Sequence, residues 1–269
     1  RVFETDENYV QTKALLISTG GNPSGYRLAK MLGHQIIKPV PSLFTFTCKD
    51  DKLRSCKGVS LQNIELKLLV NKSFFTSIGD LLITHWGFSG PAVLKLSSIA
   101  ARELFLTKYK CQLIIKWSSL NRKELLNKLN QLREFNGKSY LYNLRPLPIL
   151  TKRLWLYLLN RMKISKDKRW AELLSSEKER MISLLLYDSY EISGKGPFGE
   201  EFVTSGGVDI KEINFKTMES RLSSGLFFAG EVLDIDGITG GFNFQHCWTS
   251  GWLAGMKIAQ LNKTKVTNQ

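Results

Sequence analysis

The stretch that decides the fold reads AGEVLDIDGITGGFNFQ, residues 229–245. It overlaps the end of LFFA (226–229), a short apolar run typical of a buried strand. It leads into residues 242–260, where apolar and small residues recur at helical spacing. A strand, a glycine-rich turn and a helix in this order predict an open α/β sheet, in which ligands bind beyond the carboxyl ends of the strands.

The glycines of this turn indicate a close approach between the backbone and a ligand. Gly237, Gly240 and Gly241 remove side chains where the chain must come near another group or adopt a positive φ. Because they precede a helix, backbone N–H groups and the helix dipole can face an anion or the polar edge of a ring. Glu231 follows the expected strand, where a carboxylate can accept hydrogen bonds from sugar hydroxyls. This combination predicts a nucleotide-cofactor site; the alternative is a structural turn formed by the two aspartates of the stretch.

A second strand, turn and helix come near the start of the chain. The apolar run ALLIS (14–18) is followed by TGGNPSG (19–25), a sequence typical of a turn. We expect a helix that begins with Ser24 as its N-cap and ends at Gly33. This is half of a βαβ unit.

The pattern of apolar and polar residues changes twice between these two segments. From about 39 to 117, short alternating runs such as IELKL (64–68) predict half-buried antiparallel strands in a small barrel or sandwich, with a helix from Pro91. Residues 118–187 have helical patterns instead, and patterns typical of β-strands return after residue 188. Capping boxes are predicted for the pairs Asn121 with Glu124 and Ser176 with Glu179.

Composition limits the classes of partner. The 269 residues carry a formal net charge of +14, which is compatible with a polyanionic partner or with a lysine-rich surface. The basic run from Lys152 to Arg169 includes Trp155, but Trp155, Leu158 and Met162 fall at helical spacing. These residues are therefore predicted to be core, and nucleic acid is not the expected partner.

No apolar run approaches the roughly 20 residues of a membrane span. The four cysteines are far apart in the sequence and suggest neither a metal site nor a disulfide framework.

Three segments resemble one protein family. GLFFAGEVLDIDGITGGFNFQHCWTSGWLAG (225–255), VTSGGVDI (203–210) and LLITHWGFSGPAVL (81–94) closely resemble the BaiN/YhiN-like flavoproteins, which are FAD/NAD(P)-binding oxidoreductases. GGNPSGYRLAKMLGH (20–34), followed by PVPSLFTF (39–46), is most similar to the plant and cyanobacterial branch. The resemblance covers nearly the whole chain.

The resemblance implies a fold of class α/β and β. A FAD/NAD(P)-binding Rossmann-type domain, incomplete at its N-terminus, would be interrupted by a small β-barrel and a helical insert domain. The expected ranges are 1–38 and 207–269 for the FAD-binding domain, 39–117 and 188–206 for the barrel, and 118–187 for the helical insert. The family's opening G-x-G-x-x-G has no counterpart here, so the chain is expected to be the C-terminal part of a longer protein.

Carried over position by position, the resemblance also implies site residues. Glu231 would contact the ribityl chain of FAD, and the turn after the first strand would lie near the dinucleotide. The residues expected to bind the cofactor are Thr19, Gly20, Gly21, Gly230, Glu231, Asp236, Gly237, Gly240, Gly241, Phe242 and Asn243. His85 is a candidate for proton transfer, with a packed structural histidine as the alternative. No metal site is expected.

These observations predict a FAD-dependent oxidoreductase. NAD(P)H or a small organic substrate would be the electron donor, and the cofactor would supply the redox chemistry. The alternatives are a basic nucleic-acid-binding or RNA-modifying flavoprotein and a non-catalytic fragment. A soluble protein of the cytoplasm or the plastid stroma is expected. The residues identify neither the substrate nor the oligomeric state.

Overall fold

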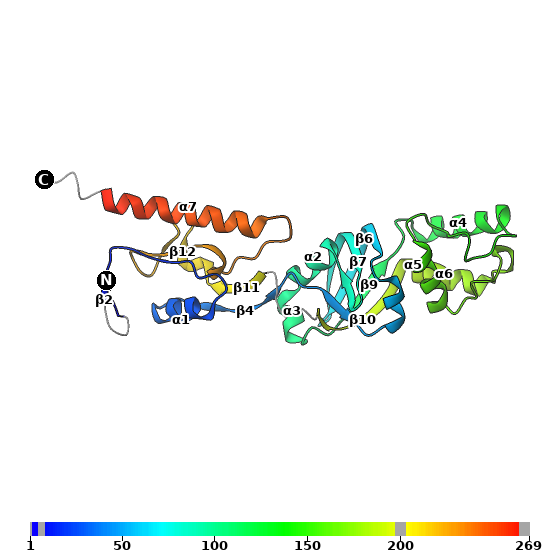
Figure 1. Ribbon diagram of the computed structural model, residues 1–269, viewed down its shortest axis with the longest axis horizontal. Helices are drawn as coiled ribbons and strands as arrows, with labels where there is room; N and C mark the ends of the chain where they lie inside the picture. Colours follow the sequence, from blue (N-terminus) through cyan, green and yellow to red (C-terminus); the bar gives the residue numbers. More distant parts are fainter. Residues whose placement is uncertain (1, 5–8, 197–202, 264–269) are drawn as a thin grey trace. The chain divides into compact units, whose positions relative to one another are not determined.

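The chain divides into two compact units. The computed structural model describes residues 2–4, 9–196 and 203–263. Unit 1 comprises Arg1–Ser42 and Glu201–Gln269, and unit 2 comprises Leu43–Glu200 (Figure 1). Each unit has a hydrophobic core of its own.

Unit 1 has the parallel strand pair of a Rossmann-type domain. Strand β3 (Leu15–Ile17) pairs in parallel with β14 (Leu226–Phe228), and β13 (Glu219–Ser220) and β12 (Ile213–Asn214) continue the sheet in antiparallel fashion. Helices α1 (Pro23–Met31) and α7 (Phe242–Lys263) lie on opposite sides of the strands of this unit (Figure 1). The predicted α/β fold class is confirmed.

Shorter elements complete unit 1. Strand β4 (Ile36–Ser42) pairs antiparallel with β11 (Val203–Val208), and a separate hairpin joins β1 (Val2–Glu4) to β2 (Tyr9–Gln11). Single 3₁₀ turns form η3 (Ile210–Glu212) and η4 (Gly230–Val232). The turn η4 follows β14 directly and therefore lies at the carboxyl end of the parallel pair.

The start of α1 differs from the prediction. Asn22, not Ser24, is the N-cap: its side chain accepts a hydrogen bond from the Ser24 amide at 2.9 Å, and Pro23 is the first helical residue. Proline is favoured at this position because its missing N–H would have had no helical partner. The predicted N-cap at Ser24 is therefore wrong by two residues. The helix ends, as expected, just before Gly33, whose φ is 95°.

A closed six-stranded barrel forms the first part of unit 2. Its strand order is β10–β5–β8–β7–β6–β9, with β5 (Phe46–Cys48), β6 (Ser60–Val70), β7 (Ser73–Ile83), β8 (Gly87–Ser89), β9 (Cys111–Lys116) and β10 (Asp188–Lys195). Ile64, Leu66 and Leu68 are buried, as their alternation predicts. Helices α2 (Pro91–Ile99) and α3 (Ala101–Leu106) and the 3₁₀ turn η1 (Asp51–Cys56) accompany the strands, and α2 begins at the expected proline.

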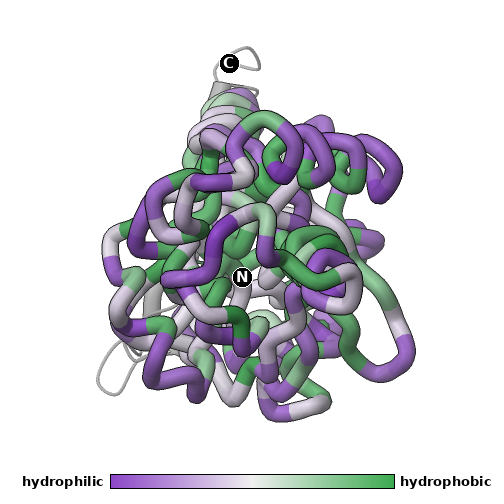
Figure 2. The backbone as a smooth tube through the Cα atoms, turned by 90° about the vertical axis from the view of Figure 1, so that its right-hand side faces the viewer, coloured by the Kyte–Doolittle hydropathy of each residue, from purple (hydrophilic) through white to green (hydrophobic). Residues whose placement is uncertain are grey.

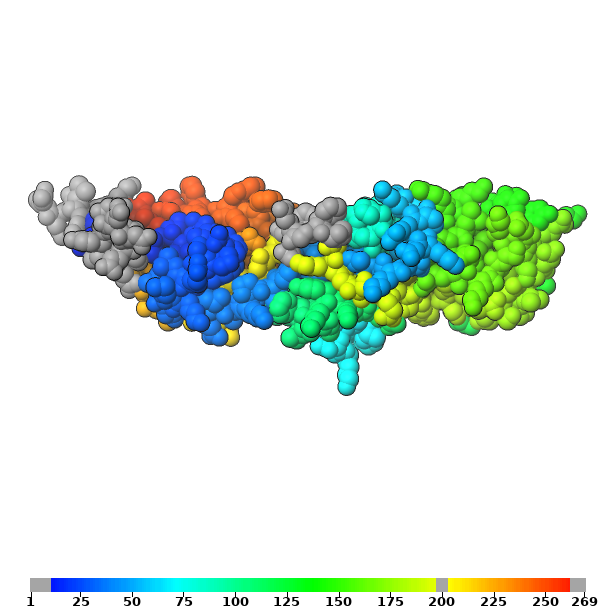
Figure 3. Space-filling view, turned by 60° about the horizontal axis from the view of Figure 1, so that its bottom comes forward, coloured from blue at the N-terminus to red at the C-terminus, as the bar shows by residue number. Residues whose placement is uncertain are grey.

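Helices form the rest of unit 2. They are α4 (Arg122–Phe135), α5 (Lys152–Arg161) and α6 (Ser175–Tyr187), with the 3₁₀ turn η2 (Trp170–Glu172). In Figure 2, hydrophilic and hydrophobic stretches alternate along the tube, as amphipathic helices require. The segment that holds these helices, in green, is a continuous packed body in Figure 3. Trp155, Leu158 and Met162 are buried, so the prediction that they are core is confirmed.

One predicted capping box is present and one is wrong. Asn121 and Glu124 exchange the two expected hydrogen bonds at the start of α4. At α6 the helix begins one residue earlier than the predicted cap, and the side chain of Glu177 accepts a hydrogen bond from the Leu174 amide at 2.9 Å. Glu179 forms a salt bridge with Arg122 of α4 instead.

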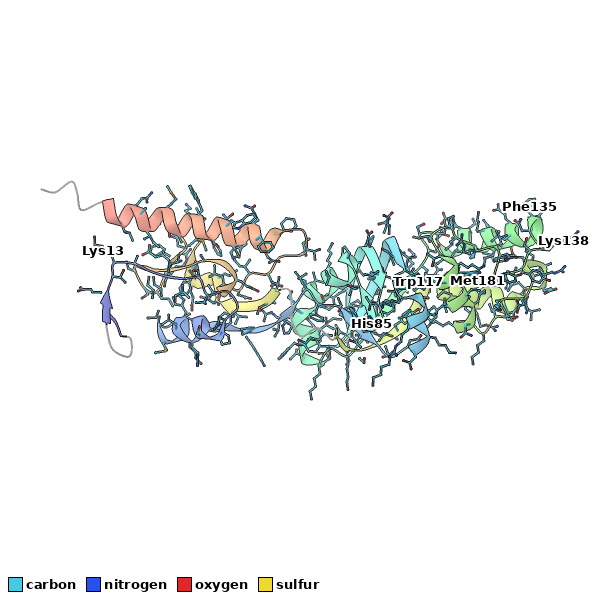
Figure 4. All side chains as sticks on the ribbon, in the orientation of Figure 1. Lys13, His85, Trp117, Phe135, Lys138 and Met181 are labelled. Carbon is cyan, nitrogen blue, oxygen red and sulfur yellow. The ribbon has the colours of Figure 1, made fainter. Side chains whose placement is uncertain are left out.

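A buried polar network ties α5 to the barrel. Arg161 donates to Asp188 at 2.8 Å and to Asp50 at 3.2 Å, while Trp117 and Tyr190 donate to Asp188 at 2.8 and 2.6 Å. Figure 4 labels Trp117 near the junction of the strands and helices of unit 2. Burial raises the pKa of Asp188, although each of these donors favours its charged form. No helix among the described residues is both long and apolar enough to cross a membrane.

Candidate cofactor site

The turn after β14 is anchored to α7. The Gly230 amide donates to Ser250 Oγ at 2.9 Å, and His246 Nε2 lies 3.3 Å from the Gly230 carbonyl oxygen. Gly230 has a φ of 76°, and a Cβ there would lie 3.4 Å from Cys247 Sγ. Glycine is therefore required for the left-handed backbone conformation at this position. The contacts of Gly230 with α7 fix the place of the next residue, Glu231.

Glu231 lies beside the turn at 19–21. Its Oε1 atom accepts a hydrogen bond from the Thr204 amide at 2.8 Å. A Cβ placed on Gly20 would lie 4.0 Å from Oε2, so the fold brings the two predicted segments together within unit 1. Oε2 accepts no hydrogen bond from the residues that the structure describes. One carboxylate oxygen therefore remains able to accept a hydrogen bond from a ligand.

The turn itself depends on Gly20 and Gly25. Gly20 has a φ of 62°, in the left-handed region. A Cβ on Gly25 would lie only 1.8 Å from Thr19 Oγ1, so the absence of a side chain lets α1 pack against the strand end. Gly21 is exposed and faces Thr204, whose Oγ1 would lie 3.1 Å from a Cβ at that position.

Side-chain hydrogen bonds hold the loop before α7 within unit 1, and they involve Asp236, Gly237 and Asn243. Asn243 Oδ1 accepts from the Gly237 amide at 2.7 Å, and Asn243 Nδ2 donates to the Gly237 carbonyl at 3.0 Å. Asp236 Oδ2 accepts from Ser42 Oγ at 3.0 Å. The Asn243 side chain thus closes the loop before α7, while Asp236 joins that loop to the end of β4.

The backbone amides at the start of α7 donate to no protein atom among the described residues. Gln245 is the first residue whose amide donates to a carbonyl, that of Gly241 at 2.9 Å. Within the described ranges, the N–H groups of residues 240–244 make no hydrogen bond. Gly240 and Gly241 have φ values of 120° and 86°, and a Cβ on Gly241 would meet no atom within 4 Å. This helix start therefore combines unsatisfied donors, the positive end of the helix dipole and open space.

Two further residues at this site were not predicted. Tyr26 is 8% exposed, and its buried hydroxyl has no hydrogen-bond partner among the residues that the structure describes. Burial raises the pKa of Tyr26, and the charges of Glu231 and Asp234 raise it further. Thr204 contributes the amide that holds Glu231. Neither position stands out in the sequence, because only the folded chain brings α1 and β11 beside the turn.

The histidines have different surroundings. His85 belongs to unit 2, where it is exposed, packs edge-on against Trp86 with ring centroids 4.3 Å apart and is labelled in Figure 4. It lines a cavity of about 740 Å³ with Thr47, Cys48, Lys49, Asp51, Arg54, Trp86 and Ser193. This cavity contains none of the predicted cofactor-binding residues. His34 is buried between Glu212 and Ser220, at 2.8 and 2.9 Å, which is a structural arrangement.

Comparison with known proteins identifies the family. Residues 2–257 match the family described as HI0933-like protein Rossmann domain. The chain is 31% identical over 269 residues to a ribosomal RNA dihydrouridine synthase of Haemophilus influenzae, covering 96% of this chain and 63% of that protein. It is 31% identical over 260 residues to a ribosomal RNA dihydrouridine synthase of Escherichia coli, covering 93% and 61%.

A reductase is also among the relatives. The chain is 28% identical over 247 residues to a 3-dehydro-bile acid delta(4,6)-reductase of Clostridium scindens, covering 90% of this chain and 59% of that protein. The chain thus spans about three fifths of the length of these curated relatives. Together with the parallel pair β3–β14 and the glycine-rich start of α7, the matches establish that this chain belongs to the HI0933-like Rossmann-domain family.

Proposed function

We propose that this chain contributes part of the flavin site of a FAD-dependent reductase. The observation that carries the proposal is the unpartnered row of amides at residues 240–244, with open space at Gly241. Flavin rings carry acceptor atoms along one edge, and such an edge needs donors of this kind. Glu231, with one free carboxylate oxygen beside the turn at 19–21, fits the hydroxyl groups of a ribityl or ribose chain.

Each residue then has a defined role. The amides of Gly240–Asn243 and the dipole of α7 would favour negative charge on the edge of the ring that they face. Thr204 orients Glu231, while Ser250 and His246 hold the turn that carries it. When bound, FAD supplies the capacity to accept a hydride from a nicotinamide or organic donor and to pass on the electrons. The protein chain positions the ring and sets the charge around it.

Glu231→Gln tests the role of the carboxylate. The glutamine Oε1 can still accept from the Thr204 amide, so the turn is retained, but the negative acceptor for sugar hydroxyls is lost. We expect FAD affinity to fall about tenfold, the effect of one hydrogen bond to a charged group. A fluorescence titration with FAD measures it.

The control is Glu134→Gln on α4, which removes the same charge from an exposed side chain in unit 2. FAD affinity that is equal in the two variants would contradict the proposed role of Glu231.

A second candidate function is the reduction of a base in RNA. Two of the relatives are named ribosomal RNA dihydrouridine synthases, and the chain has a net charge of +14. Unit 2 also has two adjoining cavities, of about 740 and 490 Å³, that share Arg161 and Lys163. Lys52 lines one, and Arg180 and the exposed Tyr187 line the other. Cations with an exposed aromatic ring in a groove suit a phosphate backbone and an unstacked base.

Charge reversal in this groove tests the RNA function. We expect Lys163→Glu with Arg180→Glu to weaken the binding of an rRNA fragment at least tenfold at low salt, because each contact to a phosphate releases counterions. Filter binding over a range of salt concentrations measures the affinity and its salt dependence. The single change Lys128→Glu, on an exposed side chain of α4 that lines neither cavity, is the control. Binding that falls equally per reversed charge in both proteins would indicate only a general effect of net charge.

A further inference from the structure

Unit 1 contains a cavity that adjoins the turn at 19–21, with Gly21, Tyr26 and Thr204 in its lining. Its volume is about 460 Å³, and it is lined by Gly21, Pro23, Tyr26, Arg27, Pro39, Val40, Pro41 and Thr204. These residues come from α1, β4, β11 and the turn after β3. Three prolines, a valine and a tyrosine ring make the walls largely apolar, whereas one cation and two hydroxyl groups provide the polar contacts.

The Tyr26 hydroxyl is a buried polar group at this cavity. Tyr26 is more than nine tenths buried, and its oxygen has no hydrogen-bond partner in residues 2–4, 9–196 and 203–263. A buried hydroxyl without a partner is costly, and native proteins rarely retain one without a reason. A Cβ placed on Gly21 would lie 3.8 Å from this oxygen and 3.1 Å from Thr204 Oγ1, so both hydroxyls lie on the same side of Gly21. A ligand that reaches this side of Gly21 can accept a hydrogen bond from each.

Arg27 is the cationic residue among those that line the cavity, and the carboxylates of Glu231 and Asp234 are the negative charges that act on Tyr26. Arg27 is exposed and has no ion pair with any carboxylate in the described part of the chain. The start of α1 does not add donors, because Asn22 already satisfies the Ser24 and Gly25 amides and Pro23 has none. Arg27 is therefore the group that would select an anion, and its planar guanidinium suits an oxyanion.

We infer that this cavity binds a small organic anion, with its flat or apolar body between the prolines and its carboxylate or phosphate oxygens on Arg27, Tyr26 and Thr204. Proline and valine walls favour such a body over a free inorganic ion. Tyr26 and Thr204 would donate to the same group that Arg27 neutralises. The inference does not rest on bound flavin, although Gly21 and Thr204 also border the proposed flavin contacts around Glu231.

Three probes of similar shape test the chemistry. Benzoate and phenyl phosphate carry the two candidate anions, and benzamide is the neutral control. In calorimetric titrations of the 269-residue chain without flavin, at least one anion is expected to bind at least tenfold more tightly than benzamide. The tighter of the two anions identifies the group that the site prefers. Equal affinity for all three probes would overturn the inference.

Two variants test the residues. Arg27→Gln should weaken binding of the preferred anion at least tenfold, whereas Lys30→Gln, which removes an exposed charge from the same helix outside the cavity, should leave it unchanged. Tyr26→Phe should weaken anion binding while leaving the ligand-free melting temperature unchanged or higher, because it removes a hydroxyl that has no partner.

Equal effects of the two charge changes, or a lower melting temperature for Tyr26→Phe alone, would contradict the site. FAD binding is measured in a separate titration, so either proposal can fail without the other.

Discussion

Single glycines and hydrogen bonds determine what the candidate cofactor site can bind. Gly230 lets the chain turn at the end of β14, and Gly240 and Gly241 leave the start of α7 open. The sequence predicts Glu231 and these glycines as candidate cofactor-binding residues, because a carboxylate after a strand and glycines before a helix are visible in one short segment. It does not predict Tyr26 or the closure of Asn243 on Gly237, because a side chain's hydrogen-bond partners depend on the tertiary fold.

The stability of the folded chain should depend on pH through His246. Burial lowers the pKa of His246, and its hydrogen bond to the Gly230 carbonyl only partly opposes this. The folded chain therefore binds fewer protons here than the unfolded chain. The contribution of His246 to stability is full above the unfolded pKa of about 6.5 and is lost as the pH falls toward the lower folded value.

Urea unfolding of the wild type and of His246→Gln measures this. We expect the stability of the wild type relative to the variant to increase between about pH 5 and 7 and then to level off, because most carboxylates titrate below this range. A stability difference that is constant across this range would show that His246 does not titrate as its burial implies.

At the scale of helices and strands, local patterns predict element type better than they predict ends. The barrel strands and the helices α2, α4, α5 and α7 lie where alternation and helical spacing place them. The starts of α1 and α6 differ from the prediction, because several polar residues near each start can cap a helix and local sequence does not choose between them. Trp155, Leu158 and Met162, which recur at helical spacing, are buried in the core of unit 2.

The Arg161 network makes a prediction about α5. Asp188 has a side chain only 1% exposed, and Arg161 is its cationic partner. Arg161→Met would leave that carboxylate buried without its countercharge, and we expect the free energy of unfolding to fall by about 3–5 kcal/mol. Urea unfolding followed by tryptophan fluorescence measures the loss.

Arg153→Met on the same helix is the matched control, because Arg153 is exposed and, among the described residues, donates only to the Lys57 carbonyl. The double change Arg161→Met with Asp188→Asn should recover part of the loss, since the buried charge is removed as well. Equal losses for Arg153→Met and Arg161→Met would show that the ion pair does not stabilise the barrel–helix junction.

At the scale of the whole chain, the surface that a helix leaves exposed cannot be read from that helix alone. Helix α7 exposes a stripe of Phe244, Trp248 and Trp252, which are 68%, 68% and 69% exposed, so one face of this helix is not covered by the described residues. Helical periodicity predicts the apolar residues of α7, but not which of its faces packs inside unit 1.

The most direct test of the account concerns the amides at the start of α7. Amide NMR spectra of the ¹⁵N-labelled chain would be recorded during a titration with FAD. The resonances of Gly240, Gly241, Phe242 and Asn243 are predicted to shift at saturation, while that of Gly33, whose amide already donates to the Lys30 carbonyl, is predicted to stay in place. FAD binding that leaves the four resonances unmoved, or no binding at all, would contradict the claim that this helix start holds the flavin.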